Sequence, residues 1–475
     1  MNPRPLREVA TVIGGTLRSV THPDRPVRGV AVDSRKVSNG DLFFALPGQR
    51  RDGAEFVAHA LARGAVAAVV RSETDPASGR TAPGDPLIEV EDPARALVDL
   101  ARDQRAGSSA LVVGITGSTG KTCTKDLTAA VLGRRFRVAA SPASFNNEVG
   151  LPLTILNAPP GVEVIVCEMG SRGPGHIRLL CGVARPHIGV VTNVGTAHME
   201  LFGSPKVLED AKAELPESLP PDGTAVLNAD DGVTRGYANR TAARSVFFGN
   251  GAEAVVRARG MEIDRLTGKA RFSLAVPGGV AGVTLPVPGE HMVGNALAAA
   301  AVGWVLGVPV EEMATGLGEA AISAGRMEVF EAPDGFRVVN DAYNANPASM
   351  AAALKAARWM AGAGRCIAVL GHMAELGPIA DREHERVGEL VARLGIDGLI
   401  VVGQEAKLIA VGAEREGVEP DRIVFCEEVG QAVDAVRAAA RRGDLVLIKA
   451  SRVARLERVA EAIGSSTELE REATA

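Results

Sequence analysis

The sequence has few aromatic residues, little net charge and no long hydrophobic run. Aromatic residues make up 3% of its 475 residues, so we expect its cores to be aliphatic. The formal net charge of −5 gives no electrostatic reason to expect nucleic acid or an anionic membrane as a partner. The longest apolar stretch, Ala296–Val310, is rich in alanine and suits a buried helix better than a membrane span, which needs about 20 residues.

Cysteine is also scarce, and its spacing excludes the usual metal sites. The five cysteines are odd in number and scattered, at Cys123, Cys167, Cys181, Cys366 and Cys426. We expect them to be small buried side chains in a reducing compartment. The first residues, MNPRPLREVATVIGG, lack the apolar core and small-residue cleavage site of a signal peptide. These absences predict a cytoplasmic protein without membrane insertion.

The length and composition predict a soluble α/β protein of about three domains. Hydrophobic residues make up 46% of the chain and charged residues 23%, as is typical of globular proteins. Residues 1–95 are expected to form a small α/β domain around one helix, Gly53–Arg63. Its candidate strands are Val27–Val32, Asp41–Ala45 and Ala65–Val70.

Residues 96–324 are predicted to form a central domain around a parallel sheet. The candidate strands are Ala110–Thr116, Val162–Glu168, Ile188–Val194 and Thr224–Asn228. Each is a continuous apolar run, as expected of parallel strands that are covered on both faces. Alternating patterns between Ser245 and Pro288 predict an antiparallel extension, and the helix Asn295–Leu306 follows.

Residues 325–475 are predicted to form a Rossmann-like domain, because strands and helices alternate again. The candidate strands are Phe336–Asn340, Arg365–Leu370, Gly398–Val402, Arg422–Phe425 and Asp444–Ile448. Ligands of such doubly wound sheets bind beyond the carboxyl ends of the strands. Those ends carry Asp341, His372, Gly403 and Lys449. The polar tail 464–475 is expected to be disordered.

A glycine-rich stretch, GITGSTGKTCTKD, follows the first strand of the central domain. Backbone amides at a helix amino terminus and the helix dipole together bind anions. A lysine adds charge for the outer phosphates, and a threonine hydroxyl can ligate Mg²⁺. The residues with these expected roles in binding ATP are Gly117, Ser118, Thr119, Gly120, Lys121 and Thr122, with the helix Thr122–Leu132 behind them.

The glycine spacing of this loop is shorter than in the standard phosphate loop, which has glycine where this sequence has Ile115. The alternative is an ordinary strand–helix turn, but Gly-Lys-Thr between a strand and a helix favours nucleotide binding. A regulatory GTPase would add an Asp-x-x-Gly switch and an Asn-Lys-x-Asp base reader. Neither string occurs in this chain, which argues against that class.

A series of short blocks accompanies the phosphate loop along the chain. They read DSRKVSNGDLFFALPGQRRDGAEF, SFNNEVGLPLTIL, VCEMGSRGPGHI, TNVGTAHMELFGS, DAKAEL, GEHMVGNALAA, GRMEV, NDAYNANPASM, LGHMAELG and LIKASR. With TGSTGKT, these blocks resemble the Mur ligase family of peptidoglycan synthesis over essentially the whole chain to about residue 463. One departure is His372 in LGHMAELG, where the family pattern has an acidic residue. The role of that position stays open.

The resemblance implies a three-domain, ATP-dependent amide ligase that works through an acyl phosphate. The blocks FNNE, YNANP and MAELG indicate the branch that adds D-alanyl-D-alanine to UDP-N-acetylmuramoyl-tripeptide, giving the pentapeptide, ADP and phosphate. The alternative is the sister branch that adds the diamino acid at the third position. Folylpolyglutamate synthase shares the chemistry but does not need the DSR…GDLFFALPG block. A catalytically dead nucleotide-binding scaffold would not need the full set of catalytic residues. We expect a monomer.

Four residues carry the chemistry that the resemblance implies, with two Mg²⁺ ions as cofactors. The expected catalytic residues are Lys121, Glu168, His198 and Lys212. The expected metal ligands are Thr122, Glu168, His198 and, if carbamylated, Lys212. Glu168 at a strand end has a structural alternative as a hydrogen-bond acceptor, and a lone histidine such as His198 is often structural.

The position of Lys212 in its helix allows two interpretations, a surface lysine or a carbamylated one. In the helix Lys206–Leu215 it lies four residues after Leu208 and three before Leu215, near the apolar stripe. A lysine there often extends its charge outwards. The family instead carbamylates the matching lysine. Desolvation favours this reaction, since it lowers the pKa of the amine and makes the neutral form more available.

The resemblance also implies where the substrates bind. The nucleotide residues are Asn295 near the adenine, Arg326 on the phosphates, Asp341 near the ribose and Asn344 close by. Arg326 would arrive by domain closure, or it forms only an interdomain ion pair. The substrate residues are Ser34 and Arg35 for the uridine diphosphate end, Asn146 and Asn147 for the muramoyl-peptide or the catalytic region, and Lys449 and Arg452. These last two contact the incoming dipeptide, or they form a solvated cationic edge.

Overall fold

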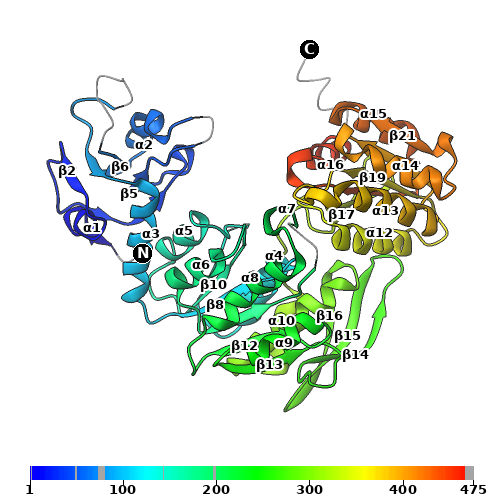
Figure 1. Ribbon diagram of the computed structural model, residues 1–475, viewed down its shortest axis with the longest axis horizontal. Coiled ribbons are helices and arrows are strands. Elements are labelled where there is room, and N and C mark those ends of the chain that lie inside the picture. Colours follow the sequence, from blue (N-terminus) through cyan, green and yellow to red (C-terminus); the bar gives the residue numbers. More distant parts are fainter. Residues whose placement is uncertain (2, 49–50, 73–80, 143, 196–198, 466–475) are drawn as a thin grey trace.

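The computed structural model describes residues 1, 3–48, 51–72, 81–142, 144–195 and 199–465. The sheets are divided among three lobes, with the amino-terminal and carboxyl-terminal lobes on either side of a central one (Figure 1). The predicted three-domain α/β architecture is confirmed. Within the described residues, no helix is both long and apolar enough to cross a membrane.

The amino-terminal lobe contains a five-stranded sheet in the order β2-β7-β6-β5-β4. Its strands are β2 (Thr16–Arg18), β4 (Gly29–Ala31), β5 (Asp41–Phe44), β6 (Ala67–Arg71) and β7 (Leu87–Val90), and a ribbon pairs β1 (Arg4–Pro5) with β3 (Pro26–Val27). The lobe also contains helices α1 (Leu6–Val12) and α2 (Val57–Ala62). The three predicted strands are present, and within the five-stranded sheet only β2 runs antiparallel to its neighbour. Strands β2 and β7 were not predicted, because neither short run stands out from the turn-rich segments beside it.

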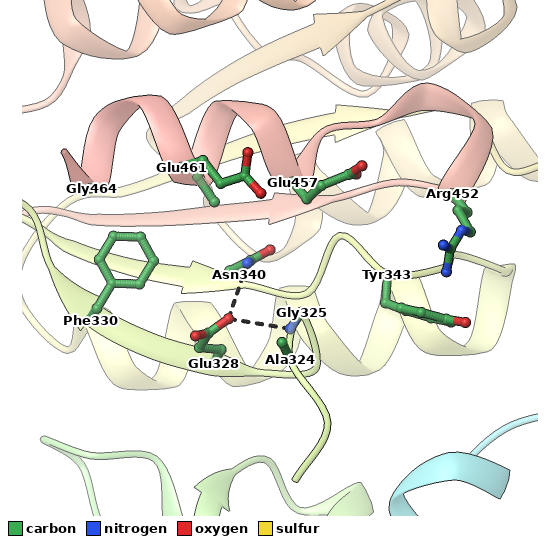
Figure 2. Close-up of a pocket in the computed structure, with 11 residues that line it drawn as sticks. Ala324, Gly325, Glu328, Phe330, Asn340, Tyr343, Arg452, Glu457, Glu461 and Gly464 are labelled. Atoms are coloured by element: carbon green, nitrogen blue, oxygen red, sulfur yellow. Dashed lines mark hydrogen bonds between the residues drawn. The ribbon is translucent and has the colours of Figure 1, made fainter. Parts of the chain in front are cut away.

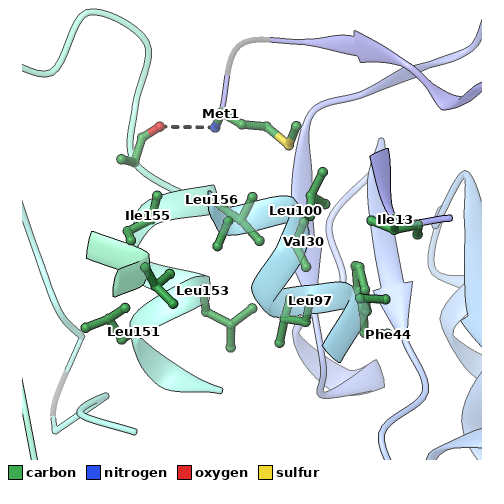
Figure 3. Packing of buried hydrophobic residues seen from close by; sticks show 14 of the residues in the cluster. Met1, Ile13, Val30, Phe44, Leu97, Leu100, Leu151, Leu153, Ile155 and Leu156 are labelled. Atoms are coloured by element: carbon green, nitrogen blue, oxygen red, sulfur yellow. Dashed lines mark hydrogen bonds between the residues drawn. The ribbon is translucent and has the colours of Figure 1, made fainter. Parts of the chain in front are cut away.

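A shared apolar core joins this lobe to the central one. Helix α3 (Pro93–Ala106) packs against helix α5 (Gly150–Leu156), and Leu97, Leu100 and Leu156 are fully buried between them (Figure 3). The side-chain amide of Asn157 also exchanges two hydrogen bonds of 2.9 Å with the backbone of Val30. The amino-terminal lobe is therefore anchored by packing and not only by its linker.

The central lobe contains a six-stranded parallel sheet in the order β13-β12-β11-β8-β10-β9. Its strands are β8 (Leu111–Thr116), β9 (Val138–Ala140), β10 (Val164–Glu168), β11 (Ile188–Val191), β12 (Thr224–Asn228) and β13 (Arg244–Phe248). Its helices include α4 (Lys121–Leu132), α6 (His176–Ala184), α7 (Met199–Phe202), α8 (Pro205–Glu217) and α9 (Gly232–Gly236). The four predicted strands form the middle of this sheet. Parallel order brings their carboxyl ends to one edge, which is where the phosphate loop begins.

Three antiparallel strands extend the central lobe, in the order β14 (Arg257–Ile263), β15 (Lys269–Val276) and β16 (Gly279–Pro288). The predicted antiparallel extension is confirmed for these strands. It was wrong for β13, which pairs in parallel with β12 because it continues the main sheet as its edge strand. The helices α10 (His291–Val305) and α11 (Val310–Gly318) cover this region, and the alanine-rich run predicted as a buried helix lies mostly within α10.

The carboxyl-terminal lobe contains a six-stranded sheet in the order β17-β18-β22-β19-β20-β21. Its strands are β17 (Glu328–Glu331), β18 (Arg337–Asn340), β19 (Cys366–Gly371), β20 (Gly398–Val402), β21 (Ile423–Cys426) and β22 (Leu445–Lys449). Its helices are α12 (Pro347–Ala361), α13 (Ala380–Arg393), α14 (Lys407–Arg415), α15 (Val429–Ala439) and α16 (Glu457–Gly464). Only β17 is antiparallel to its neighbour. Strand β17 was not predicted, because most of its side chains are exposed.

The five cysteines are buried and free, as expected. Burial raises the pKa of the Cys167 and Cys181 thiols to about 12. Thiols with such pKa values carry almost no thiolate near neutral pH, which makes them poor nucleophiles. These side chains therefore act as small apolar core residues.

Candidate functional site

The phosphate loop lies at the carboxyl edge of β8 and leads directly into α4. Two of its glycines adopt positive φ angles, 145° at Gly117 and 78° at Gly120. A side chain at Gly117 would collide with the Thr192 hydroxyl, and one at Gly120 would collide with the Asn295 amide. The close approach of neighbouring side chains therefore requires glycine at both positions.

The ammonium group of Lys121 lies against the carbonyls of this loop. Its Nζ donates to Gly117 O at 2.8 Å and to Ser118 O at 3.4 Å. Burial lowers the pKa of Lys121, while the carboxylate of Glu168 acts in the opposite direction. Lys121 thus lies at the amino terminus of α4, a position that favours a bound anion.

The side chain of Asn193, which follows β11, holds the middle of the loop. Its Oδ1 accepts hydrogen bonds from the Thr119 backbone N at 3.1 Å and from the Thr119 hydroxyl at 3.0 Å. The Thr192 hydroxyl donates to Thr119 O at 2.6 Å. The sequence analysis did not single out these two residues. The block TNVGTAH and its position after a buried strand were the available signal.

Glu168, at the end of β10, lies between two polar side chains. Thr122 Oγ1 donates to its Oε2 at 2.6 Å, and Asn146 Nδ2 donates to its Oε1 at 2.8 Å. The Glu168 side chain is buried, with 1% of its surface exposed. A hydroxyl oxygen and a carboxylate oxygen in contact are a ligand pair of the type that Mg²⁺ prefers. Among the described residues no group of three or more His, Cys, Asp or Glu side chains could hold a metal.

Lys212 lies on α8 with only 1% of its surface exposed. Its Nζ has no hydrogen-bond partner among the residues that the structure describes. Burial, together with the positive charge of Lys121, holds the pKa of Lys212 well below its usual value. The alternative of a lysine that extends its charge outwards is therefore wrong, and burial makes the neutral amine more available. His198, the remaining predicted catalytic residue, lies outside the described residues.

Two glycines of the sheet explain why α8 packs so closely on it. Added side chains at Gly114 on β8 and Gly189 on β11 would each contact Leu215 of α8 at 3.0–3.1 Å. The helix begins at Ser204, whose hydroxyl accepts from Val207 N at 3.3 Å. The cap and the two glycines fix the helix that carries Lys212 against the sheet.

The carboxyl-terminal lobe contributes an aromatic and cationic wall to the site. Arg326 Nη2 donates to Thr122 Oγ1 at 2.7 Å, and its guanidinium lies 4.1 Å from the ring centre of Tyr343. Arg452 lies 5.2 Å from the same ring. Tyr343 hydrogen-bonds to Ser144 of the central lobe. The sequence analysis named both arginines and missed Tyr343, which lies within the YNANP block.

Lys449 is committed to a buried ion pair. Its Nζ lies 2.5 Å from Asp341 Oδ2 and 3.0 Å from Asn344 O. The Lys449 residue is 1% exposed, so its reading as a solvated cationic edge is wrong. Arg452 is exposed. Asp341 also accepts a hydrogen bond from Met327 N at 3.1 Å, which links the start of this lobe to its sheet edge.

A cavity of about 740 Å³ lies between the central and carboxyl-terminal lobes. The predicted site residues that line it are Ser118, Thr119, Gly120, Lys121, Thr122, Asn146, Asn147, Glu168, Asn295, Arg326, Asp341, Asn344, Lys449 and Arg452. Lys212 and Gly117 are not among the residues that line it. The sequence analysis thus identified side chains that come from two lobes and converge on one space.

A second cavity, of about 550 Å³, lies next to the first and shares Tyr343 and Arg452 with it. Figure 2 shows Glu457 and Glu461 of α16 on one side and Glu328 of β17 on the other. Glu328 accepts hydrogen bonds from Asn340 Nδ2 and Gly325 N. No residue of the phosphate loop lines this cavity.

Ser34 and Arg35 lie in the amino-terminal lobe and do not line the large cavity. Arg35 donates to both carboxylate oxygens of Asp33, at 2.9 and 2.8 Å, and these hydrogen bonds lower the pKa of Asp33 to about 2. Ser34 Oγ lies 2.9 Å from His59 Nδ1. The structure therefore places the two predicted substrate residues apart from the phosphate loop.

His372 packs against another histidine and does not line the large cavity. Its ring stacks on His384, with ring centres 5.3 Å apart and an angle of 9° between the planes. His384 Nε2 accepts from Met373 N at 2.9 Å, and burial lowers the pKa of His384. The pair supports the turn that leads into the MAELG block.

A phosphate loop, a buried carboxylate and a buried lysine in a three-lobed α/β chain define a nucleotide-binding enzyme. Three family models match the chain: Mur ligase family, catalytic domain, over residues 26–105; Mur ligase middle domain, over 115–303; and Mur ligase, glutamate ligase domain, over 325–452. The chain belongs to the Mur ligase family, and it is an ATP-dependent ligase of that family. The resemblance read from the sequence is confirmed.

Individual relatives and solved structures agree over the full length. UDP-N-acetylmuramoyl-tripeptide–D-alanyl-D-alanine ligase of Mycobacterium tuberculosis strain H37Rv is 41% identical, over 96% of both chains. A crystal structure of MurF from Acinetobacter baumannii aligns with a TM-score of 0.84 at 28% identity, over 98% of this chain and all of that one. MurF ligase from Thermotoga maritima, solved in complex with ADP, aligns with a TM-score of 0.78 at 30% identity, over 94% of this chain and 99% of that one.

Proposed function

We propose that this chain joins D-alanyl-D-alanine to UDP-N-acetylmuramoyl-tripeptide, converting ATP to ADP and phosphate. The observation that carries this proposal is the relative of that name, which is 41% identical and matches over 96% of both chains. The product would be UDP-N-acetylmuramoyl-pentapeptide, a precursor of peptidoglycan. The sister reaction, addition of the third-position diamino acid, is less well supported, because relatives in Mycobacterium bovis, Bacillus subtilis and Escherichia coli are named as D-alanyl-D-alanine ligases.

The proposed reaction needs two anions brought together. The carboxylate of the tripeptide attacks the γ-phosphorus of ATP, a P–O bond to ADP breaks, and an acyl phosphate forms. Lys121 and Arg326, which face the cavity from opposite lobes, offset the repulsion between these anions. The amine of the dipeptide then attacks the acyl carbon, phosphate leaves, and the amine proton is released. Asn295, Asp341 and Asn344 are proposed to contact the nucleotide.

The donor set at the phosphate loop fits Mg²⁺. Thr122 and Glu168 present oxygen atoms 2.6 Å apart at the end of the loop, and oxygen is the ligand atom that Mg²⁺ prefers. Two such ions, when bound, would neutralise phosphate charge and polarise the reacting oxygens. We propose that Thr122, Glu168 and His198 hold metal, together with Lys212 if it is carbamylated.

The environment of Lys212 supports carbamylation. A neutral lysine amine attacks CO₂, an N–C bond forms, and one proton is lost as the carbamate anion appears. The buried Lys212 Nζ lies without a hydrogen-bond partner among the described residues, and its lowered pKa favours the reactive neutral amine. The positive charge of Lys121, which disfavours a charged Lys212, would stabilise the carbamate instead.

We propose that the three lobes, divided at the predicted boundaries, bind different parts of the substrates. Residues 1–95 would hold the uridine diphosphate end of the substrate through Ser34 and Arg35, and residues 96–324 would hold ATP. Residues 325–475 would contribute to the nucleotide site and bind the dipeptide, with Arg452 on its carboxylate and Lys449 holding Asp341 in place. Asn146 and Asn147 line the cavity, and we propose that they position either the muramoyl-peptide or the catalytic groups. We propose that the protein is a cytoplasmic monomer.

Phosphate release measures the proposed function directly. The purified protein is given ATP, Mg²⁺ and UDP-N-acetylmuramoyl-tripeptide, together with either D-alanyl-D-alanine or single amino acids. We expect release that depends on the dipeptide. Release with diaminopimelate or lysine on the shorter UDP-N-acetylmuramoyl-dipeptide, and none with the tripeptide, would assign the chain to the sister reaction.

A further inference from the structure

Glu214 lies two residues after Lys212 on α8, but its carboxylate is directed at a different helix. Its Oε1 accepts from Gly175 N at 2.5 Å, and its Oε2 accepts from Arg178 N at 2.9 Å. The side chain is buried, with 4% of the residue exposed. Both oxygens of a buried carboxylate are thus committed to backbone amides of a segment 36 to 39 residues away.

The receiving helix, α6, has no cap of its own. Its N-cap residue is Gly175, at a φ of 82°, and no side chain of the N-cap residue accepts from the first turn. A helix amino terminus leaves backbone N–H groups without partners and favours negative charge nearby. Glu214 supplies both the missing acceptors and the negative charge from α8.

The segment that Glu214 fixes is part of the site. It begins at Glu168 and passes Ser171 and Arg172 before α6 starts at His176, and these four residues line the large cavity. At the near end, Met169 N donates to Ile115 O of β8 and Gly170 N donates to Asn146 O, both at 2.8 Å. At the far end, the carboxylate of Glu214 holds the turn into α6.

We propose that Glu214 is a positioning residue, which fixes the helix that carries Lys212 relative to the segment that begins at Glu168. The inference rests on the proposed function, since it concerns the same site. Glu168 and Lys212 lie on different elements, β10 and α8, and neither side chain bonds directly to the other. Packing on the sheet holds α8 near β10, and the two hydrogen bonds of Glu214 add a direct link between α8 and the segment that follows β10.

The same pair of helices offers a matched control. Glu217, one turn further along α8, also pairs with a residue of α6, since its carboxylate lies 3.2 Å from Arg178 Nη2. That pair lies nearer the surface, and the Arg178 side chain is 63% exposed. Glu217→Gln removes the same charge from the same helix without touching the backbone amides of α6. Glu214→Gln keeps the size but offers one acceptor oxygen where two amides need acceptors.

The first measurement is hydrogen–deuterium exchange on the ligand-free full chain. We expect the peptide covering residues 169–180 to exchange faster in Glu214→Gln than in the wild type, while Glu217→Gln leaves it unchanged. The second is steady-state kinetics with folded protein. We expect about a tenfold lower kcat for Glu214→Gln and a higher half-saturating Mg²⁺ concentration. The KM for the UDP-linked substrate should stay within about twofold of the wild type, because the proposed uridine diphosphate site is remote from Glu214.

Glu214→Asp keeps the charge on a shorter side chain and decides the matter if Glu214→Gln does not fold. We expect its kcat to lie between those of the wild type and Glu214→Gln. Equal kcat values and equal exchange in Glu214 and Glu217 variants would overturn the inference. Wild-type protein that releases no dipeptide-dependent phosphate would instead refute the proposed function, and the exchange measurement would still test the link between the helices.

Discussion

The guanidinium of Arg326 donates a hydrogen bond of 2.7 Å to the hydroxyl of Thr122. Arg326 follows the segment that leaves the central lobe, and Thr122 belongs to the phosphate loop. Their contact places a cation of the carboxyl-terminal lobe beside the residue expected to ligate Mg²⁺. Tyr343 backs the same guanidinium at 4.1 Å, so the arginine is held on two sides.

Replacing Arg326 tests this contact. Arg326→Lys keeps the charge but cannot both stack on Tyr343 and reach Thr122 with a planar donor. We expect kcat/KM to fall by about 10- to 100-fold, corresponding to about 1.5–3 kcal/mol for a hydrogen bond from a charged group. Arg134→Lys, at an exposed ion pair with Glu319, is the control and should retain wild-type kinetics. Unchanged kcat/KM in Arg326→Lys would contradict a role on the phosphates.

Gly120 tests the backbone geometry of the phosphate loop. Gly120→Ala would place a methyl group at a φ of 78° and against Asn295, and left-handed backbone costs a non-glycine residue about 1 kcal/mol before any collision. We expect ADP affinity, measured by isothermal titration calorimetry, to fall at least about tenfold. Gly182→Ala is the control, because no atom lies within 4 Å of a side chain there, and its ADP affinity should not change. Equal affinities in the two variants would show that the loop adopts another conformation.

The burial of Lys212 leads to predictions about both the stability and the activity of the protein. The folded state lowers the pKa of Lys212, so between the folded and unfolded pKa values the unfolded chain binds more protons. The free energy of unfolding of the wild type should therefore rise with pH over that interval. Lys212→Met removes the titrating amine and keeps the apolar length.

Thermal unfolding in CO₂-free buffer without Mg²⁺ measures this effect. We expect Lys212→Met to be more stable than the wild type at neutral pH, with the difference in Tm shrinking as pH rises towards 10. We also expect the variant to lose ligase activity. A Tm difference that is independent of pH would mean that Lys212 is not desolvated in the folded protein.

Replacing only one member of the Asp341–Lys449 ion pair should destabilise the folded protein. Removing one partner of a buried ion pair leaves an uncompensated charge and typically costs about 3–5 kcal/mol. Asp341→Asn should therefore lower the urea midpoint markedly, while the double variant Asp341→Asn with Lys449→Met should recover most of the loss. A double variant that is no more stable than Asp341→Asn would show that the Lys449 charge is solvated after all.

Local patterns predicted much of the fold, because the signals that specify parallel strands are local. The runs before Gly117 and before Met169 were continuous and apolar, and both became inner strands of the central sheet. Some edge strands were missed, among them β9, which has three partly buried residues, and β17, which is mostly exposed. Neither carries the period or the apolar run that reveals a strand.

Site residues that belong to a sequence motif could be predicted, whereas contacts that depend on long-range packing could not. Thr122 and Glu168 were named from a motif and a strand end. The stacking of Tyr343 on Arg326 depends on how the carboxyl-terminal lobe packs against the central one. The Asp341–Lys449 pair joins residues 108 positions apart, and the capping of α6 by Glu214 joins two helices through backbone amides. Such contacts leave no periodic trace in a sequence.

The central claim is that the carboxylate of the tripeptide takes the terminal phosphoryl group of ATP before the dipeptide attacks. Oxygen transfer tests it most directly. UDP-N-acetylmuramoyl-tripeptide labelled with ¹⁸O in its reacting carboxylate is turned over with ATP and D-alanyl-D-alanine, and the released phosphate and nucleotide are analysed by mass spectrometry. We expect one ¹⁸O atom in the phosphate and none in the nucleotide. Label in AMP, or phosphate without label, would contradict the account.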